Sequence, residues 1–184
     1  MKIRKRNRLK GYDYSRNNLY FITNCVKNKV CCLGRVVAVG TGRDLSEKHP
    51  EKHPEKHPEN PSESKYICKL NEFGEVVANK IRWLSHQYEY VEIHNFVVMP
   101  NHFHLILEID ATKLNDKQIK IKSVSSLIGA LKSTASHQIR QLGYVDFEWH
   151  RSFHDHIIRT DEAYQNISNY IDKNPEKWFE DTFF

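Results

Sequence analysis

The two histidines of the segment His102-Phe103-His104 are the first side chains here whose type and spacing could do chemistry. They open the run HFHLILEI at residues 102–109, whose pattern predicts a β-strand. Residues two apart in a strand point to the same side, so both imidazoles would leave one face while Phe103 leaves the other. Two imidazoles placed in this way can bind one divalent cation. The alternative is an ordinary pair of exposed strand residues.

A tyrosine and an asparagine form the second candidate set, in the run Tyr170-Ile171-Asp172-Lys173-Asn174-Pro175. Residues four apart share a helix face, so Tyr170 and Asn174 would point the same way if the helix continues that far. Pro175 disfavours helical geometry at Asn174, so a frayed last turn could aim the amide instead. The structural alternatives are that Tyr170 belongs to the apolar face of the helix and that Asn-Pro only ends it.

The N-terminus is strongly basic, in a chain with a net charge of +5 and a pI of about 8.9. Its cationic residues are Lys2, Arg4, Lys5, Arg6, Arg8 and Lys10. Such side chains can neutralise phosphates, and the rings of Tyr12 and Tyr14 that follow can stack on unpaired bases. This pattern indicates a nucleic-acid contact, and the alternative is a solvated terminus.

The elements that must position these residues follow from the hydrophobic pattern. Aromatic and β-branched runs predict strands at residues 19–26, 91–99, 102–109 and 153–159. Apolar residues at helical spacing predict helices at residues 74–88 and 125–142, and from the N-cap Thr160 to about residue 173. This order predicts an α+β fold of the ferredoxin-like, split βαβ kind. It is an antiparallel sheet of about four strands with helices on one face, plus a C-terminal helix that bears the tyrosine.

One segment does not belong to this pattern. Residues 47–58 read EKHPEKHPEKHP, and a proline at every fourth position prevents both a helix and a central strand. We therefore expect a mobile low-complexity insertion at residues 40–64 within a single domain spanning residues 1–184. Its His49, His53 and His57 could suggest a metal site, but a slipped repeat in a tolerant surface loop is the preferred interpretation.

Two further features narrow the class of protein. The sequence has no apolar run long enough to span a bilayer and no signal peptide, so no membrane partner is expected. The four cysteines have no CxxC spacing and include an adjacent pair, which predicts reduced thiols in a cytoplasmic protein, nucleoid-associated if bacterial. They are Cys25, Cys31, Cys32 and Cys68.

Taken together, the two candidate sets resemble a known family. The run Met99-Pro100-Asn101-His102-Phe103-His104 within VVMPNHFHLIL looks like the strand-turn-strand motif of the HUH single-tyrosine transposases. The run YIDKNPEKW, with Tyr170-Ile171 and Asn174-Pro175, resembles the tyrosine helix of their REP-associated branch. The resemblance covers about residues 90–178 well and about residues 14–26 loosely, and the repeat insertion has no counterpart in it.

The resemblance implies a role for each candidate. His102, His104 and the amide oxygen of Asn174 would bind Mg²⁺ or Mn²⁺, although Asn174 stands where insertion-sequence members are expected to have glutamine. Tyr170 would attack a DNA phosphate and form a 5′-phosphotyrosine link, which keeps the bond energy for strand joining. The implied partner is single-stranded or hairpin DNA. Both a homodimer, with the tyrosine helix exchanged, and a monomer are consistent with the family.

Two other hypotheses remain at this stage. A ferredoxin-like sheet also serves as a non-catalytic single-stranded nucleic-acid-binding module. The chain could also be an inactive transposase relic that keeps its metal ligands. The relic keeps all four candidate site residues, so the sequence does not separate it from the active enzyme. A structure with Tyr170 far from His102 and His104 would exclude the nuclease, unless a partner chain supplied the tyrosine.

Overall fold

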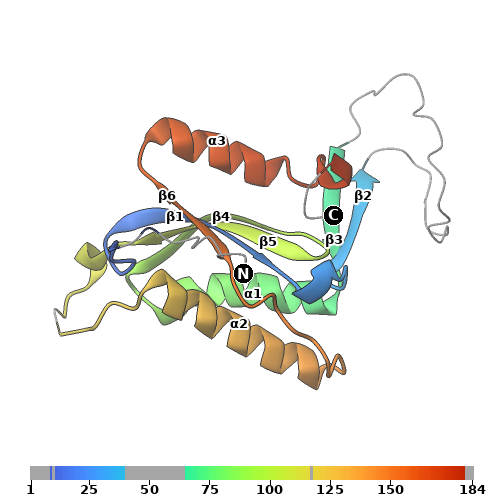
Figure 1. Ribbon diagram of the computed structural model, residues 1–184, viewed down its shortest axis with the longest axis horizontal. Coiled ribbons are helices and arrows are strands. Elements are labelled where there is room, and N and C mark those ends of the chain that lie inside the picture. The colour runs from blue at the N-terminus through green and yellow to red at the C-terminus, as the bar shows by residue number, and fades with distance from the viewer. Residues whose placement is uncertain (1–8, 10, 40–64, 117, 181–184) are drawn as a thin grey trace, which may run out of the picture.

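The computed structural model describes residues 9, 11–39, 65–116 and 118–180 (Figure 1). Its centre is a four-stranded antiparallel sheet with the strand order β4-β5-β1-β6. The strands are β1 (Asn18–Cys25), β4 (Val91–Val98), β5 (His102–Ile109) and β6 (His154–Ile158). This order confirms the ferredoxin-like prediction, and the observed bounds lie within about a residue of the expected ones.

Helices cover both faces of this sheet (Figure 1). Helices α1 (Glu72–Gln87) and α2 (Val124–Gln141) lie together on one face, where they enclose the main core. Helix α3 (Asp161–Asp172), the predicted tyrosine helix, lies across the other face. The strand β5 is therefore buried on both sides along most of its length.

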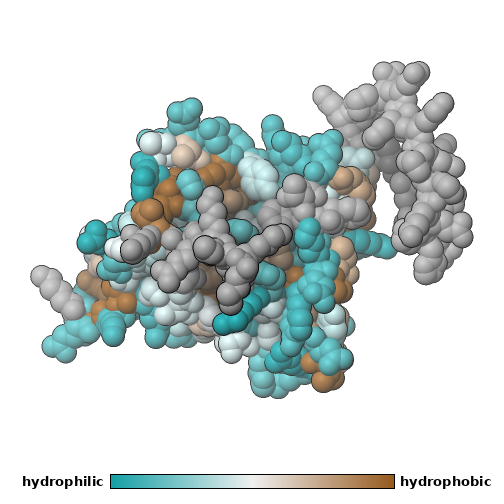
Figure 2. All heavy atoms as spheres, viewed as in Figure 1, coloured by the Kyte–Doolittle hydropathy of each residue, from teal (hydrophilic) through white to brown (hydrophobic). Residues whose placement is uncertain are grey.

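The alternation of β5 assigns its side chains to these two layers. Phe103 and Leu105 point into the core under α1 and α2. Ile106 points the other way and packs with Ile158 and Ile171 beneath α3. Hydrophobic residues are visible along this seam beneath α3 in Figure 2. His102 and His104 are separated from Ile106 by an even number of positions, so their side chains also point to the α3 face.

Helix α3 begins as the sequence predicts. The hydroxyl of Thr160 accepts a hydrogen bond from the backbone N–H of Ala163 at 3.1 Å, which caps the first turn. Asp161 and Glu162 follow in that turn, where the helix dipole favours negative charge. The cap and the apolar contacts of Ile171 together fix the helix over the sheet.

The structure contains two strands that the sequence pattern did not predict. β2 (Gly34–Val39) and β3 (Lys65–Leu70) form a separate two-stranded antiparallel sheet, which we call the β2–β3 arm. The arm stands at the end of the main sheet where β1 ends and β5 begins (Figure 1). Its base packs closely on α1, because a Cβ at Gly74 would lie only 2.0 Å from the carbonyl oxygen of Leu33.

Two of the expectations fall on residues outside the described ranges. They are the basic N-terminus, with Lys2, Arg4, Lys5, Arg6, Arg8 and Lys10, and the insertion at residues 40–64. No disulfide joins the cysteines of the described ranges. None of the helices in these ranges has the length and hydropathy needed to cross a membrane.

Candidate active site

The two histidines of β5 are buried side by side, each held through one ring nitrogen. His102 is fully buried and its Nδ1 lies 2.7 Å from Oδ1 of Asn101. His104 is 1% exposed and its Nδ1 lies 2.7 Å from the hydroxyl of Thr23, its cross-strand neighbour on β1. The carbonyl of Asn101 requires a proton on Nδ1 of His102, and the Thr23 hydroxyl can accept the corresponding proton of His104. In that arrangement each ring carries its proton on Nδ1, and neither Nε2 is protonated.

The two Nε2 atoms converge at a distance that suits a shared cation. They lie 3.0 Å apart. With both Nδ1 atoms protonated, both Nε2 atoms carry lone pairs that face each other, which a bound cation would stabilise. The two nitrogens can therefore act as ligands of one divalent cation.

Burial also keeps His104 in the form that binds metals. Desolvation, and then the nearby charge of His102, lower the pKa of His104 well below its ordinary value of 6.5. An imidazole must be neutral to ligate a metal ion. His104 is therefore neutral at physiological pH, which is the form in which an imidazole can ligate a metal ion.

Tyr170 on α3 reaches the histidine pair of its own chain. Its hydroxyl lies 3.3 Å from Nε2 of His104, and the two rings meet edge to face with centroids 5.1 Å apart. Phe21 of β1 stacks on His104, with ring centroids 5.4 Å apart, and also meets the ring of Tyr170 edge to face. The tyrosine oxygen thus lies against the same nitrogen that could bind a cation.

Asn174 lies in the turn that follows α3, which ends at Asp172. Its side chain is fully buried, and its backbone N–H donates to the carbonyl of Ile171. The chain then enters the short 3-10 helix η3 (Trp178–Glu180), and Trp178 stacks on His102 with ring centroids 6.0 Å apart. Tyr170 precedes Asn174 in the chain and Trp178 follows it. Because both of these side chains contact the histidine pair, the turn that contains Asn174 lies at the same corner of the sheet.

Several residues of this cluster were not predicted. Thr23 and Phe21 come from β1, and neither could be assigned without the register that pairs Thr23 with His104. Asn101, which directly precedes His102, is the one whose position in the sequence could have suggested its role. Trp178 lies in a segment with no periodic signal, so only the packing identifies it.

A second group of possible ligands lies on β4 and on β5. One ligand atom each of Glu92, His94 and Glu108 lies within 4.8 Å of the others, in a largely exposed position. His94 Nε2 lies 2.9 Å from a carboxylate oxygen of Glu108, and Lys113 forms an ion pair with Glu92. These pairings account for the cluster as surface electrostatics, so we do not assign it to the histidine–tyrosine site.

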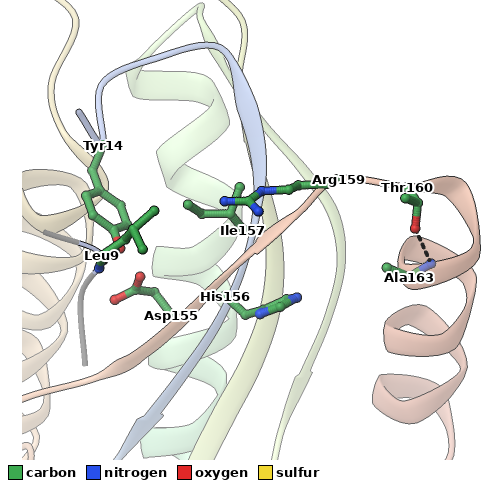
Figure 3. Close-up of a pocket in the computed structure, with 8 residues that line it drawn as sticks. All are labelled: Leu9, Tyr14, Asp155, His156, Ile157, Arg159, Thr160 and Ala163. Carbon is green, nitrogen blue, oxygen red and sulfur yellow. Dashed lines mark hydrogen bonds between the residues drawn. The ribbon is translucent and has the colours of Figure 1, made fainter. Parts of the chain in front are cut away.

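A pocket of about 330 Å³ lies along the edge strand β6 and the start of α3 (Figure 3). Asp155, Ile157 and Arg159 line it from β6 and the residue after that strand, and Tyr14 closes one side. None of its lining residues belongs to the histidine–tyrosine cluster. The pocket is therefore a separate feature of the edge of the sheet.

Comparison with known proteins identifies the fold. A curated protein from Haemophilus influenzae, named only as an uncharacterized protein, is 28% identical over 190 residues that cover 96% of this chain and 91% of that protein. No protein-family model matches the chain.

The solved structure of a REP-associated tyrosine transposase bound to a REP hairpin aligns over 97% of this chain and 74% of its own, with a TM-score of 0.54 and 18% identity. A protein from Deinococcus radiodurans aligns over 90% of this chain and 95% of its own, with a TM-score of 0.47 and 14% identity. The chain thus shares the fold of the REP-associated tyrosine transposase.

Proposed function

We propose that this chain is a metal-dependent tyrosine transposase, or a site-specific single-stranded DNA endonuclease of the same kind. The observation that carries the proposal is the position of the Tyr170 hydroxyl, 3.3 Å from Nε2 of His104 and beside the converging histidine pair. The fold shared with a transposase bound to a REP hairpin supports hairpin or single-stranded DNA as the substrate.

The residues present fit a divalent cation. His102 and His104 would hold it through their Nε2 atoms, and the amide oxygen of Asn174 would be the third protein ligand. Two imidazole nitrogens and an amide oxygen would suit Mg²⁺ or Mn²⁺. When bound, such an ion polarises a phosphate oxygen and so makes the phosphorus more open to attack.

Tyr170 would carry out the covalent step. Its oxygen loses its proton to solvent water and attacks the phosphorus, so that a P–O bond forms. The bond to the 3′ oxygen breaks with its electron pair leaving on that oxygen, which takes up a proton from water. The product is a 5′-phosphotyrosine and a free 3′ hydroxyl, and attack by a 3′ hydroxyl reverses the step and joins strands. The contacts of Tyr170 with Phe21 and His104 fix the phenol in position for this attack.

The structure does not favour the alternative of a binding module that stacks bases on its sheet. One face of the sheet carries α1 and α2, and α3 lies on the other. A base-stacking sheet requires an open face with aromatic side chains. The contacts of Tyr170 with His104 instead support a nucleophile on the covered face, beside the proposed metal ligands.

The test is covalent capture of DNA. The intact chain is incubated with a labelled pool of DNA hairpins that carry single-stranded flanks, in the presence of Mn²⁺, and protein–DNA adducts are separated under denaturing conditions. We expect an adduct with the intact chain and none with Tyr170→Phe or with His102→Ala/His104→Ala. Tyr164→Phe is the matched control, because Tyr164 lies on the same helix but its hydroxyl contacts His94 instead. Absence of an adduct from the intact chain, or an adduct that survives in Tyr170→Phe, would refute the proposal.

A further inference from the structure

We propose that the outward face of the β2–β3 arm binds the double-stranded stem of a DNA hairpin. This inference rests on the proposed function, because it assumes that the chain acts on hairpin DNA. It assigns binding of the duplex to an element that is separate from the histidine–tyrosine cluster. That face is basic, it belongs to a two-stranded ribbon, and the base of the arm is bonded to the turn that precedes the histidines.

The outward face of the arm is basic and contains no acidic residue. The cross-strand register pairs Arg35 with Lys69, Val37 with Ile67, and Val39 with Lys65. Since these six residues share one parity, they form one face, and all three cationic side chains on it are exposed. Val39 and Ile67 are also 44% and 42% exposed, which leaves an apolar strip between the charges.

The pairing of Arg35 with Lys69 is unfavourable in the absence of a ligand. Like charges directly opposite each other on neighbouring strands destabilise a sheet. Within the described ranges, no carboxylate forms an ion pair with either side chain. A polyanion lying across the arm would neutralise both charges, as the phosphates of a DNA backbone do.

The shape of the arm favours duplex over single-stranded DNA. A two-stranded β-ribbon fits the major groove of a DNA duplex, where cationic side chains reach the phosphates and apolar ones contact thymine methyl groups. Single-stranded DNA is instead gripped by aromatic side chains that stack on its bases. The outward face has none, since the tyrosine of the arm, Tyr66, has the opposite parity and is half-buried.

The base of the arm is tied to the turn that precedes the histidines. The backbone N–H groups of Cys32 and Leu33 both donate to the carbonyl of Pro100, each at 2.9 Å. The amide of Asn101 donates to the carbonyl of Lys29, and Asn101 also holds His102. A stem bound on the arm would therefore lie at a fixed position relative to the histidine pair, with its single-stranded flank close to Tyr170.

The experiment compares the double variant Arg35→Gln/Lys69→Gln with a charge-matched control. Lys120→Gln/Lys122→Gln removes the same charge from exposed residues in the loop at the opposite end of the sheet (Figure 1). Affinity is measured for a labelled hairpin with a stem of about 10 base pairs, one helical turn, and for its single-stranded flank alone. A melting curve of each variant confirms that it is folded.

We expect the arm variant to bind the hairpin about tenfold more weakly at ~0.15 M salt, with a slope of log affinity against log salt reduced by about 1.8 for two lost phosphate contacts. Its affinity for the flank alone and the hairpin affinity of the control should be unchanged. Unchanged hairpin affinity of the arm variant, or an equal loss for the hairpin and the flank, would overturn the assignment. If the intact chain forms the Tyr170 adduct while the arm variant binds normally, only this inference fails. If the intact chain neither binds hairpins nor forms an adduct, the proposed function fails with it.

Discussion

Replacing Thr23 by valine should test whether the contact that orients His104 supports the proposed metal site. Thr23 and His104 are 4% and 1% exposed, and the Thr23 hydroxyl is 2.7 Å from His104 Nδ1. Valine has nearly the same shape as threonine but cannot accept a hydrogen bond. The substitution therefore leaves the packing intact and a buried imidazole N–H without its acceptor, where water cannot replace it.

The expected magnitude follows from this contact. A buried donor left unsatisfied costs about 1–3 kcal/mol of the free energy of unfolding. If His104 is a ligand, loss of the group that orients its ring should also weaken metal binding by about 10–100-fold. Without Thr23 the proton of His104 is no longer held on Nδ1. When that proton is on Nε2, this nitrogen has no lone pair with which to bind a metal ion.

The assay is calorimetric titration of the folded protein with Mn²⁺, together with urea denaturation in EDTA. Thr134→Val is the matched control, because Thr134 lies on α2 on the other side of the sheet and its hydroxyl only contacts the carbonyls of Ala130 and Leu131. The control should bind Mn²⁺ as the intact chain does. A folded Thr23→Val variant with unchanged Mn²⁺ affinity would show that the contact has only a structural role and would remove the basis for His104 as a ligand.

Two further predictions concern stability. The pKa of His104 is lowered well below 6.5 by burial, so below about pH 6.5 the unfolded chain binds more protons than the folded one. The free energy of unfolding, measured in EDTA, should then fall by up to about 1.4 kcal/mol for each pH unit below 6.5. The His104→Asn variant should show a shallower fall with pH. Equal slopes for the intact chain and the variant would contradict this prediction. Gly74→Ala should lower the free energy of unfolding in urea by about 1–3 kcal/mol, because its Cβ would lie 2.0 Å from the carbonyl oxygen of Leu33. The control is Gly129→Ala in α2, which should not destabilise the protein because its Cβ would meet open space.

The β2–β3 arm is the part of the fold that the sequence pattern did not predict. The β2 run GRVVAV is short, and the alternating β3 run KYICKL adjoins the repeat segment, so neither suggested a strand by itself. The two runs become strands by pairing with each other across 25 intervening residues, at positions 40–64. Such long-range pairing is not visible in local periodicity.

The sequence by itself determined the local features of this protein. Alternation along residues 102–109 placed His102 and His104 on one face of a strand, and Thr160 marked the start of the tyrosine helix, because strand parity and helix capping depend only on neighbouring residues. The tertiary structure alone decided that Thr23 holds His104, that Tyr170 reaches the histidine pair of its own chain, and that Trp178 stacks on His102. These contacts join residues more than 60 positions apart, and they depend on strand register and on the packing of α3 over the sheet, which only the folded chain fixes.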